Sequence, residues 1–414
     1  MMRLHARTLL FASALLAGPG FADTGITGEA ATSIQPGLAD SGRDIALQAD
    51  QQQQLRRTIT ALESEYGAYG PALPEQLLSL GLSLQQEGRH GDAIAVFKRG
   101  THLARVTSGL YSTEQIPLLQ SEVASLTALK DYLGADQRQD YLYRVQMRAL
   151  SDPAQRTRAL LQHARWQGQA YIHAIDEEPA QRLLQMWELN RLALNAILEE
   201  EGDQSPALLE PLHEMLRAHY LISDYQLQSG SGTGHGFNDR GGRRLTGYRK
   251  DNYDQGRALL KAIHNLEQIH RQPGADTPAL TLVMLGDWML WHQKHEEAFA
   301  VYRQAIEELV ADDGAELSAA RFLGKPEALP ATMASDPLSP RASTSSGDVV
   351  LEFTVSAEGR VSNLNRLDDN SNANGFANRL MRRLRQTLFR PRFDLATGEP
   401  LATEKLTLAY DSKQ

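Results

Sequence analysis

The 414-residue sequence contains no cysteine. This absence excludes disulfide bonds, thiolate metal sites and a lipid anchor attached through cysteine. Aromatic residues are also few, at 7%. The one long apolar run, from Leu9 to Ala17, is about half of the roughly 20 residues that a membrane-spanning helix needs. We therefore expect a mature chain without a transmembrane segment, whose core is large enough to be stable without disulfides.

The N-terminus has the pattern of a Sec-type signal peptide. Arg3 and Arg7 precede the apolar run, and the small residue Ala22 follows it. We expect residues 1–22 to be cleaved off behind Ala22 and the chain to be released into the bacterial periplasm. The formal net charge is -9, and loss of the two arginines would make the chain more acidic. An acidic chain disfavours nucleic-acid binding, so we expect no nucleic-acid partner.

Composition and periodicity divide the rest of the chain. Residues 23–46 are rich in small and polar residues and predict a flexible leader. Residues 47–323 have apolar positions at helical spacing, interrupted by a glycine-dense loop at 229–249. Residues 324–347 hold four prolines among Ser, Thr and Ala and predict a linker. Residues 348–414 then change to a period of two, which predicts a small α+β domain.

The helical region predicts about eleven amphipathic helices separated by short breaks. Five prolines each fall just inside the start of a helical segment, where the missing N–H costs nothing. These prolines are Pro74, Pro153, Pro179, Pro206 and Pro278.

Two stretches carry a longer pattern that suits paired antiparallel helices. The positions are Leu77, Leu80, Gly81, Leu84, Ala93, Phe97 and Gly100 in the first stretch, and Leu282, Leu285, Gly286, Met289, Ala298, Tyr302 and Ala305 in the second. The first glycine of each set would let one helix approach the alanine on the next, while the aromatic ring fills the space beyond. The chain here resembles the tetratricopeptide repeat (TPR) family, over residues 74–107 and 279–312. An irregular helical bundle is the alternative.

The resemblance implies a TPR-like solenoid whose groove is lined by the first helix of each pair. It assigns six residues to a partner-binding groove: Glu75, Gln85, Gln86, Asp287, Leu290 and Trp291. A Trp in a groove is a common anchor for a partner. Packing of Trp291 against the next repeat is the alternative.

The C-terminal region predicts a strand, a hairpin turn at Glu358 and Gly359, a second strand, a helix and a final strand. This order, with the segments VSAEG at 355–359 and FRP at 389–391, resembles the C-terminal domain of TonB-type energy transducers. The resemblance implies about three strands and one or two helices. The fold class is therefore mainly α, a helical-repeat solenoid followed by a small α+β domain.

This domain offers two further candidate binding surfaces. Arginines are concentrated within a short segment, and Arg suits bidentate contact with carboxylate or phosphate. They are Arg379, Arg382, Arg383, Arg385, Arg390 and Arg392. The final strand, with Thr403, Lys405 and Thr407 beside its apolar face, is predicted to lie at a sheet edge and accept an extended peptide. Ordinary solvation of the helix and coverage of the edge by the linker are the alternatives.

The sequence contains no pattern that predicts catalysis. His213 and His219, and likewise His264 and His270, lack the spacing that places two imidazoles on one helix face. His292 falls in the turn between two predicted helices, where we expect it to be solvated. The loop GSGTGHG matches neither dinucleotide nor P-loop spacing. We therefore expect no enzyme activity, no cofactor and no metal.

We hypothesise a periplasmic protein-interaction scaffold, in which a TPR-like groove and a TonB-like domain, joined by a flexible tether, bind protein or peptide partners of the cell envelope. The alternative is a TonB-like component of outer-membrane transport that acts with a separate membrane-anchored partner. An enzyme with a site assembled from scattered polar residues is a third possibility.

Overall fold

A computed structural model gives the structure of the chain. It divides into a unit of residues 1–53 and a unit of residues 54–414, and the contacts described below lie within the second. The structure describes residues 38–175, 178–229, 240–272, 276–310, 316–329, 342–343, 347–403 and 405–411. The predicted signal peptide lies outside these residues.

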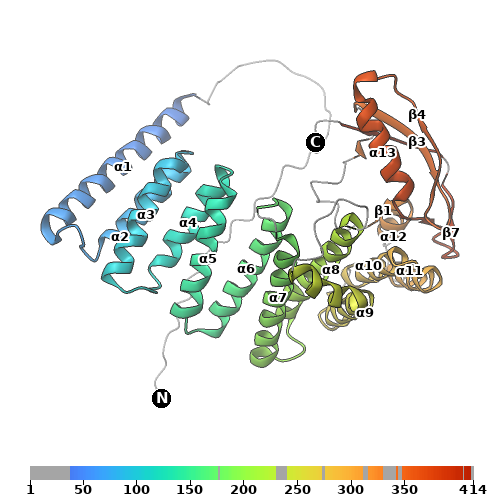
Figure 1. Cartoon of the computed structure of the whole chain (residues 1–414), viewed down its shortest axis with the longest axis horizontal. Helices are drawn as coiled ribbons and strands as arrows, with labels where there is room; N and C mark the ends of the chain where they lie inside the picture. Colours follow the sequence, from blue (N-terminus) through green and yellow to red (C-terminus); the bar gives the residue numbers. More distant parts are fainter. Residues whose placement is uncertain are drawn as a thin grey trace, which may run out of the picture. The chain divides into compact units, whose positions relative to one another are not determined.

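The larger part of the described chain is helical, and successive helices follow one another in the order of the sequence (Figure 1). The helices are α1 (Leu38–Tyr66), α2 (Leu73–Gln86), α3 (His90–Thr107), α4 (Gln115–Ala128), α5 (Tyr132–Ala149), α6 (Pro153–Ile172), α7 (Pro179–Glu201), the short 3-10 helix η1 (Pro206–Leu208), α8 (Leu209–Ser229), α9 (Arg240–Ile269), α10 (Thr277–Trp291), α11 (His295–Val310) and α12 (Glu316–Leu323). Within the described ranges, none of these helices is long and apolar enough to cross a membrane.

Local sequence explains where these helices begin. Each of the five predicted prolines lies in the first turn of α2, α6, α7, η1 or α10, which confirms the prediction. Side chains cap two further starts, because Asp131 accepts the backbone N–H of Gly134 and Asp152 accepts that of Gln155. Each cap satisfies one of the N–H groups that a helix start leaves unpaired.

In two helix hairpins, α2–α3 and α10–α11, an aromatic ring of the second helix lies on a glycine of the first. A Cβ atom added at Gly81 on α2 would clash with the ring of Phe97 on α3, and one added at Gly286 on α10 would lie 2.5 Å from Cε1 of Tyr302 on α11. Both packing glycines were predicted, but the close partner is the aromatic ring and not the alanine. The same device recurs unpredicted at Gly256 on α9, which lies against Trp288. The helical region is thus built as TPR-like hairpins.

The C-terminal domain, residues 347–411, is a small α+β unit, as predicted. Its helix is α13 (Asn374–Gln386), preceded by η3 (Ser371–Ala373). A four-stranded antiparallel sheet has the order β2-β8-β3-β4, and two short ladders pair β1 with β5 and β6 with β7. The strands are β1 (Glu327–Ala328), β2 (Ala342–Ser343), β3 (Val349–Val355), β4 (Val361–Arg366), β5 (Phe389–Arg390), β6 (Arg392–Phe393), β7 (Pro400–Leu401) and β8 (Leu406–Tyr410).

The predicted alternation of β3 positions the core of this domain. Val349, Leu351, Phe353 and Val355 are all buried and pack with Leu380 and Leu384 of α13. Gly359 in the hairpin turn has φ +79°, and its position leaves no room for a Cβ beside the carbonyl of Phe389. Because L side chains rarely adopt this φ, glycine suits the turn.

Several predicted boundaries are wrong. The first helix begins at Leu38, inside the predicted leader, and α9 begins at Arg240, inside the predicted glycine-dense loop. Both ends of the predicted linker also contribute strands, since β1 pairs with β5 and β2 pairs with β8. The other residues of the linker, from 330 to 341 and from 344 to 346, lie outside the described chain.

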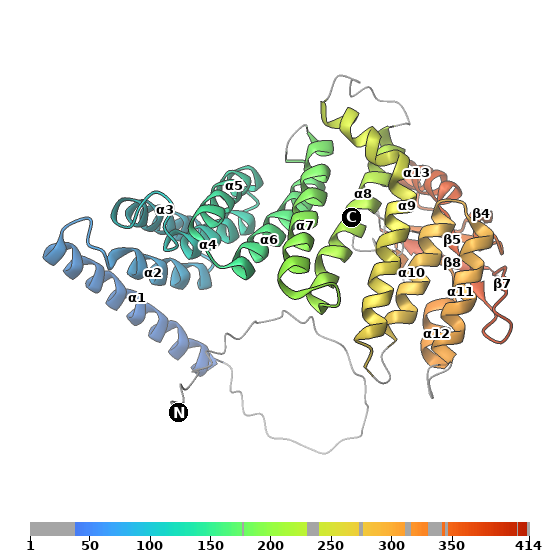
Figure 2. The ribbon, with the colours of Figure 1, turned by 90° about the horizontal axis from the view of Figure 1, so that it is seen from below.

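The predicted flexible tether between the two regions is likewise wrong. The C-terminal domain packs directly on the last helical hairpin, and Figure 2 shows α10, α11 and α12 beside its strands. Leu388 and Phe393 belong to the same buried cluster as Leu285 and Tyr302. The ring centroids of Phe393 and Tyr302 are 4.9 Å apart. This shared apolar core holds the domain against the hairpin.

Candidate interaction surfaces

The predicted groove residues on α2 have different surroundings. Glu75 and Gln86 are exposed, so both are accessible to a partner. Gln85 is half-buried and donates through Nε2 to the carbonyl of Ser121, at 3.3 Å, and to Oγ of Ser125, at 3.0 Å. Gln85 therefore joins α2 to α4, the first helix of the next hairpin.

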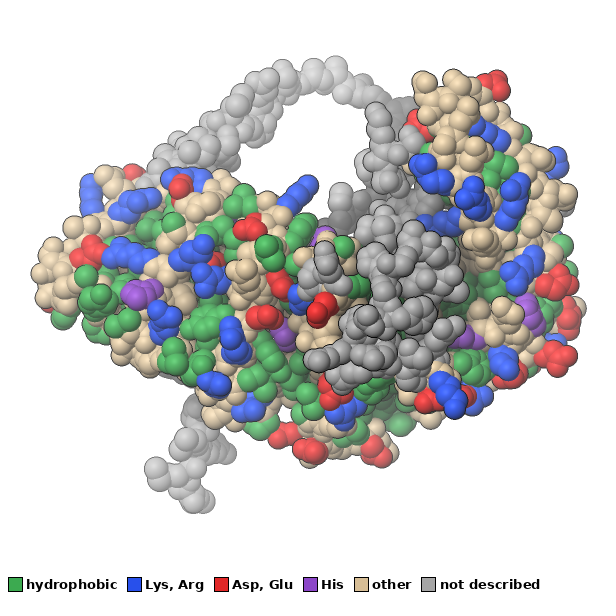
Figure 3. All heavy atoms as spheres, viewed as in Figure 1, with side chains coloured by type: hydrophobic (Ala, Val, Ile, Leu, Met, Phe, Trp, Pro, Cys, Tyr) green, Lys and Arg blue, Asp and Glu red, His purple; other side chains and the backbone are tan. Residues whose placement is uncertain are grey.

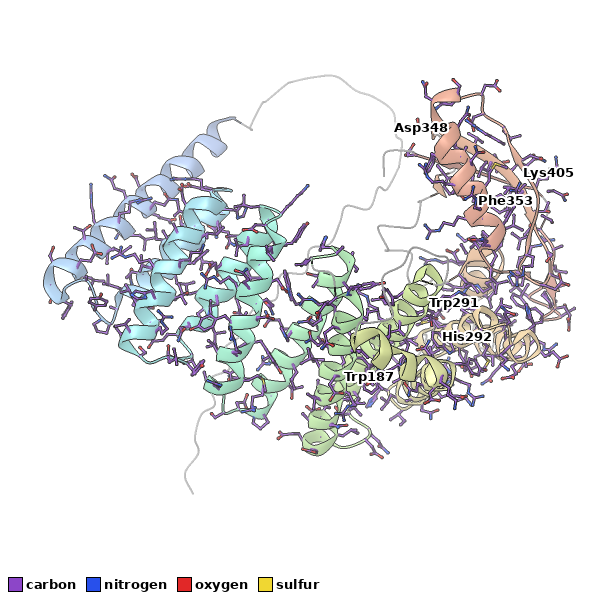
Figure 4. All side chains as sticks on the ribbon, viewed as in Figure 1. Trp187, Trp291, His292, Asp348, Phe353 and Lys405 are labelled. Carbon is purple, nitrogen blue, oxygen red and sulfur yellow. The ribbon has the colours of Figure 1, made fainter. Side chains whose placement is uncertain are left out.

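The predicted groove residues on α10 face other parts of the chain. Asp287 and Leu290 are buried. The half-buried Trp291 ring stacks on Tyr220, with centroids 5.4 Å apart, and meets the Trp288 ring edge-on at 6.0 Å. Figure 4 shows Trp291 next to His292 at the end of α10. Trp291 therefore packs against other residues of the chain, as the alternative to a groove anchor predicted. We leave Asp287, Leu290 and Trp291 out of the binding surface proposed below.

Asp287 lies at the centre of a buried polar triad. Its Oδ2 accepts a hydrogen bond from Nη1 of Arg390 on β5, and its Oδ1 accepts one from the hydroxyl of Tyr302, both at 2.7 Å. Burial raises the pKa of Asp287, and the Arg390 guanidinium opposes that shift. Burial also raises the pKa of Tyr302 well above its usual value, with the charge of Asp287 adding to it. The phenol stays protonated and donates, so the triad pairs the last hairpin with the C-terminal domain.

The helix α13 presents basic side chains on the face opposite its buried stripe. Arg379, Arg382, Arg383 and Arg385 are exposed, and the helix contains no acidic residue. Figure 3 shows blue side chains gathered over this part of the C-terminal domain. The other two arginines of the predicted cluster lie elsewhere, since Arg390 is buried on Asp287 and Nε of Arg392 donates to the carbonyl of Ala402 at 3.1 Å. We define the arginine face as these four residues of α13.

The final strand, β8, is only partly the edge that we predicted. Ala409 and Tyr410 pair with β2, while the opposite side of β8 pairs with β3 along its whole length. Thr403 bonds to the backbone of Val355, and Nζ of Lys405 lies 2.9 Å from Oε1 of Glu352. Thr407 is exposed. Linker residues thus cover one end of the strand, which is the alternative that the sequence left open.

Sequence reasoning did not identify the desolvation of His163, His219 and His292. His292 is not solvated in its turn, because it lies against Trp288 with ring centroids 4.5 Å apart, and burial lowers its pKa to about 4. Burial likewise lowers the pKa of His163 to about 4; this ring stacks on Tyr143. Tyr143 lies on the preceding helix α5, and Trp288 lies one turn before His292, but the burial of both imidazole rings depends on the surrounding helices, which spacing alone does not reveal.

The third histidine, His219, belongs to a buried network between α7, α8 and α9. Nε1 of Trp187 can only donate, so Nε2 of His219 accepts at 3.1 Å and its Nδ1–H donates to Oδ1 of Asn252. Burial lowers the pKa of His219. The neutral ring is an ordinary buried hydrogen-bonding group. Across the described ranges, no group of three or more potential ligands could hold a metal ion.

A cavity of about 470 Å³ lies between α6, α7 and the start of α8. Its floor includes Leu161, Ile197 and Leu209, and its rim includes charged residues. No sequence motif marks it. The one local signal is the break between α7 and α8, where Gly202 has φ +85° and Pro206 starts η1. The rim residues are Arg158, Glu200, Glu201 and Glu210.

Some solved structures are similar to this chain, one of them described as having TPR-like repeats. Repeats of a kinesin light chain from Podosopora anserina share 13% identity, cover 57% of this chain and 94% of their own, and give a TM-score of 0.38. BtubC from P. vanneervenii also shares 13% identity, covers 66% and 92%, and gives 0.41. No family model and no curated protein matches the chain. At these scores the similarity is loose, and the hairpin architecture rests on the contacts described above.

Proposed function

We propose that this chain is a protein-interaction scaffold that is exported to the bacterial periplasm. The observation that supports the scaffold function is the succession of TPR-like hairpins, two of which are closed by an aromatic ring lying on a glycine. Each such hairpin buries one face against its neighbours and leaves a further surface exposed, and stacked hairpins of this kind form extended binding surfaces. The N-terminal segment with Arg3, Arg7 and Ala22 supports export.

The arginine face of α13 is the second contact in this proposal. Four guanidinium groups without an acidic residue on the same helix create a local positive field on an acidic chain. Such a face suits an acidic segment of a partner protein, because guanidinium binds carboxylate in a bidentate manner. The first contact is the exposed surface of the helical hairpins, which includes Glu75 and Gln86 on α2.

Affinity capture from periplasm tests the proposal. The wild-type chain is compared with a variant carrying Arg379→Glu, Arg382→Glu and Arg383→Glu, and with a control carrying the same charge change at exposed positions on α1 and α9. The control substitutions are Arg56→Glu, Arg57→Glu and Lys261→Glu. We expect a defined set of captured proteins that the α13 variant loses and the control retains. Recovery of the chain in the cytoplasm with Met1 retained, or capture that no variant changes, would contradict the proposal.

Coupling to outer-membrane transport is the second candidate. The order β3, β4, α13 and β8 agrees with the predicted strand, strand, helix and strand, and part of the outer side of β8 has no partner strand among the described residues. In this role a separate anchored protein would supply the membrane link. Outer-membrane receptors among the captured proteins would favour it over the general scaffold.

A further inference from the structure

We propose that the cavity between α6, α7 and α8 binds a short peptide segment that carries an apolar side chain next to a basic one. This inference deepens the scaffold function and rests on it. We name the site the α6–α8 pocket, with the floor and rim residues given above.

The pocket exists because small side chains and a displaced helix start leave space there. Gly202 ends α7 in a conformation that L residues rarely adopt, and η1 is inserted before α8. Ala154, Ala196 and Ala207 line the resulting space. Between α2, α3 and α4, earlier in the chain, no such space is left, because Leu118 on α4 lies directly on Gly100 of α3. The pocket is therefore a local departure from the packing of the hairpins.

The floor of the pocket selects an apolar group. Leu161 and Ile197 are buried at its base, and Leu209 lies half-buried beside them. Its volume of about 470 Å³ exceeds that of one large side chain and falls within the range of small-ligand sites. A leucine or aromatic side chain would displace water from apolar surface there.

The rim of the pocket selects positive charge. Glu200, Glu201 and Glu210 stand around the opening with Arg158 as the one basic rim residue. Glu210 pairs with Arg165, and Glu201 accepts a hydrogen bond from Oγ of Ser205. Among the described residues, Glu200 has no ion-pair partner.

Together the floor and the rim fit an apolar side chain flanked by Lys or Arg. An acidic peptide would meet like charge at the rim, and a basic peptide without an apolar side chain would leave the floor unfilled. These two failures define the controls for the binding experiment.

Fluorescence anisotropy on the full mature chain tests the pocket with three labelled hexapeptides, ALRLRA, ALELEA and ASRSRA. We expect ALRLRA to bind at least ten-fold more tightly than the other two. Ala196→Trp, which fills the pocket, and the pair Glu200→Lys and Glu201→Lys, which inverts the rim, should each weaken binding at least ten-fold. The matched control pair Glu296→Lys and Glu307→Lys, at exposed positions on α11, should leave it unchanged.

Equal affinity for the three peptides, or binding that survives both pocket variants, would overturn the proposal. Glu200→Lys alone changes an exposed residue and leaves the Glu201–Ser205 hydrogen bond in place, so it decides the outcome even where the other variants prevent folding. The experiments distinguish a failure of the pocket proposal from a failure of the scaffold proposal. If the chain still captures its α13-dependent partners while the peptides show no preference, the pocket proposal alone is wrong.

Discussion

At the scale of single residues, the fold depends on places where an aromatic ring lies on a glycine. Phe97 and Tyr302 are fully buried, and each occupies the volume that a side chain at Gly81 or Gly286 would need. Protein interiors are close-packed, so such a position tolerates no added side chain without movement of the neighbouring helix.

Gly286→Leu is expected to destabilise the chain by roughly 1–3 kcal/mol or more, because the new side chain would overlap the Tyr302 ring. Urea unfolding followed by circular dichroism measures this change. The control is Gly91→Leu on α3, where an added Cβ meets nothing within 4 Å, and we expect a change within about 0.5 kcal/mol there. Equal stability of the Gly286 variant and the wild type would show that this close approach is absent.

His163 gives the stability a pH dependence of known sign. Its pKa is about 4 in the folded chain, against an ordinary value of 6.5, so between these values the unfolded chain binds more protons. Stability therefore falls as the pH drops from about 7 to about 4, by at most about 3 kcal/mol from this group. Urea unfolding of His163→Gln and wild type at pH 7.5, 6 and 5 measures it. The variant should show the shallower loss, and identical slopes would contradict the burial of this ring.

At the scale of elements, the sequence predicted what short-range chemistry determines. Proline positions located five helix starts, and the alternation from Val349 to Val355 located the buried strand of the C-terminal sheet. The sequence could not predict which elements contact one another. Its position on α10 predicted that Asp287 lies in an exposed groove, yet Asp287 is buried and forms an ion pair with Arg390, which is far away in sequence. The α6–α8 pocket also depends on three elements meeting, and no local motif encodes that.

The pairing of α10 with β5 can be measured through the buried ion pair. Arg390→Met should destabilise the chain by about 3–5 kcal/mol, because it leaves the Asp287 carboxylate buried without its counter-charge. The combination Asp287→Leu, Arg390→Met and Tyr302→Phe removes the whole triad and should cost less than Arg390→Met alone. Chemical denaturation measures both variants. An additive or larger loss in the triple variant would contradict the coupling that the structure shows.

At the scale of the whole molecule, the described helices and the C-terminal domain share one core at their junction. Leu388 and Phe393 complete the apolar surface of the last hairpin, and Nη1 of Arg303 lies 3.2 Å from Oε1 of Glu399. The junction places the arginine face at a fixed position relative to α10 and α11. A partner that binds both the arginine face and the outer surface of this hairpin would then meet preorganised surfaces, which lowers the entropic cost of binding.

Site-specific photocrosslinking in cells tests the scaffold function most directly. A photoreactive residue is placed at the exposed positions Gln86 on α2 and Arg382 on α13, and, as control, at the exposed position Lys261 on α9, outside both proposed contacts. We predict discrete crosslinked species of higher mass from Gln86 and Arg382 and none from Lys261. The absence of any intermolecular crosslink at Gln86 and Arg382 beyond that seen at Lys261 would contradict the account.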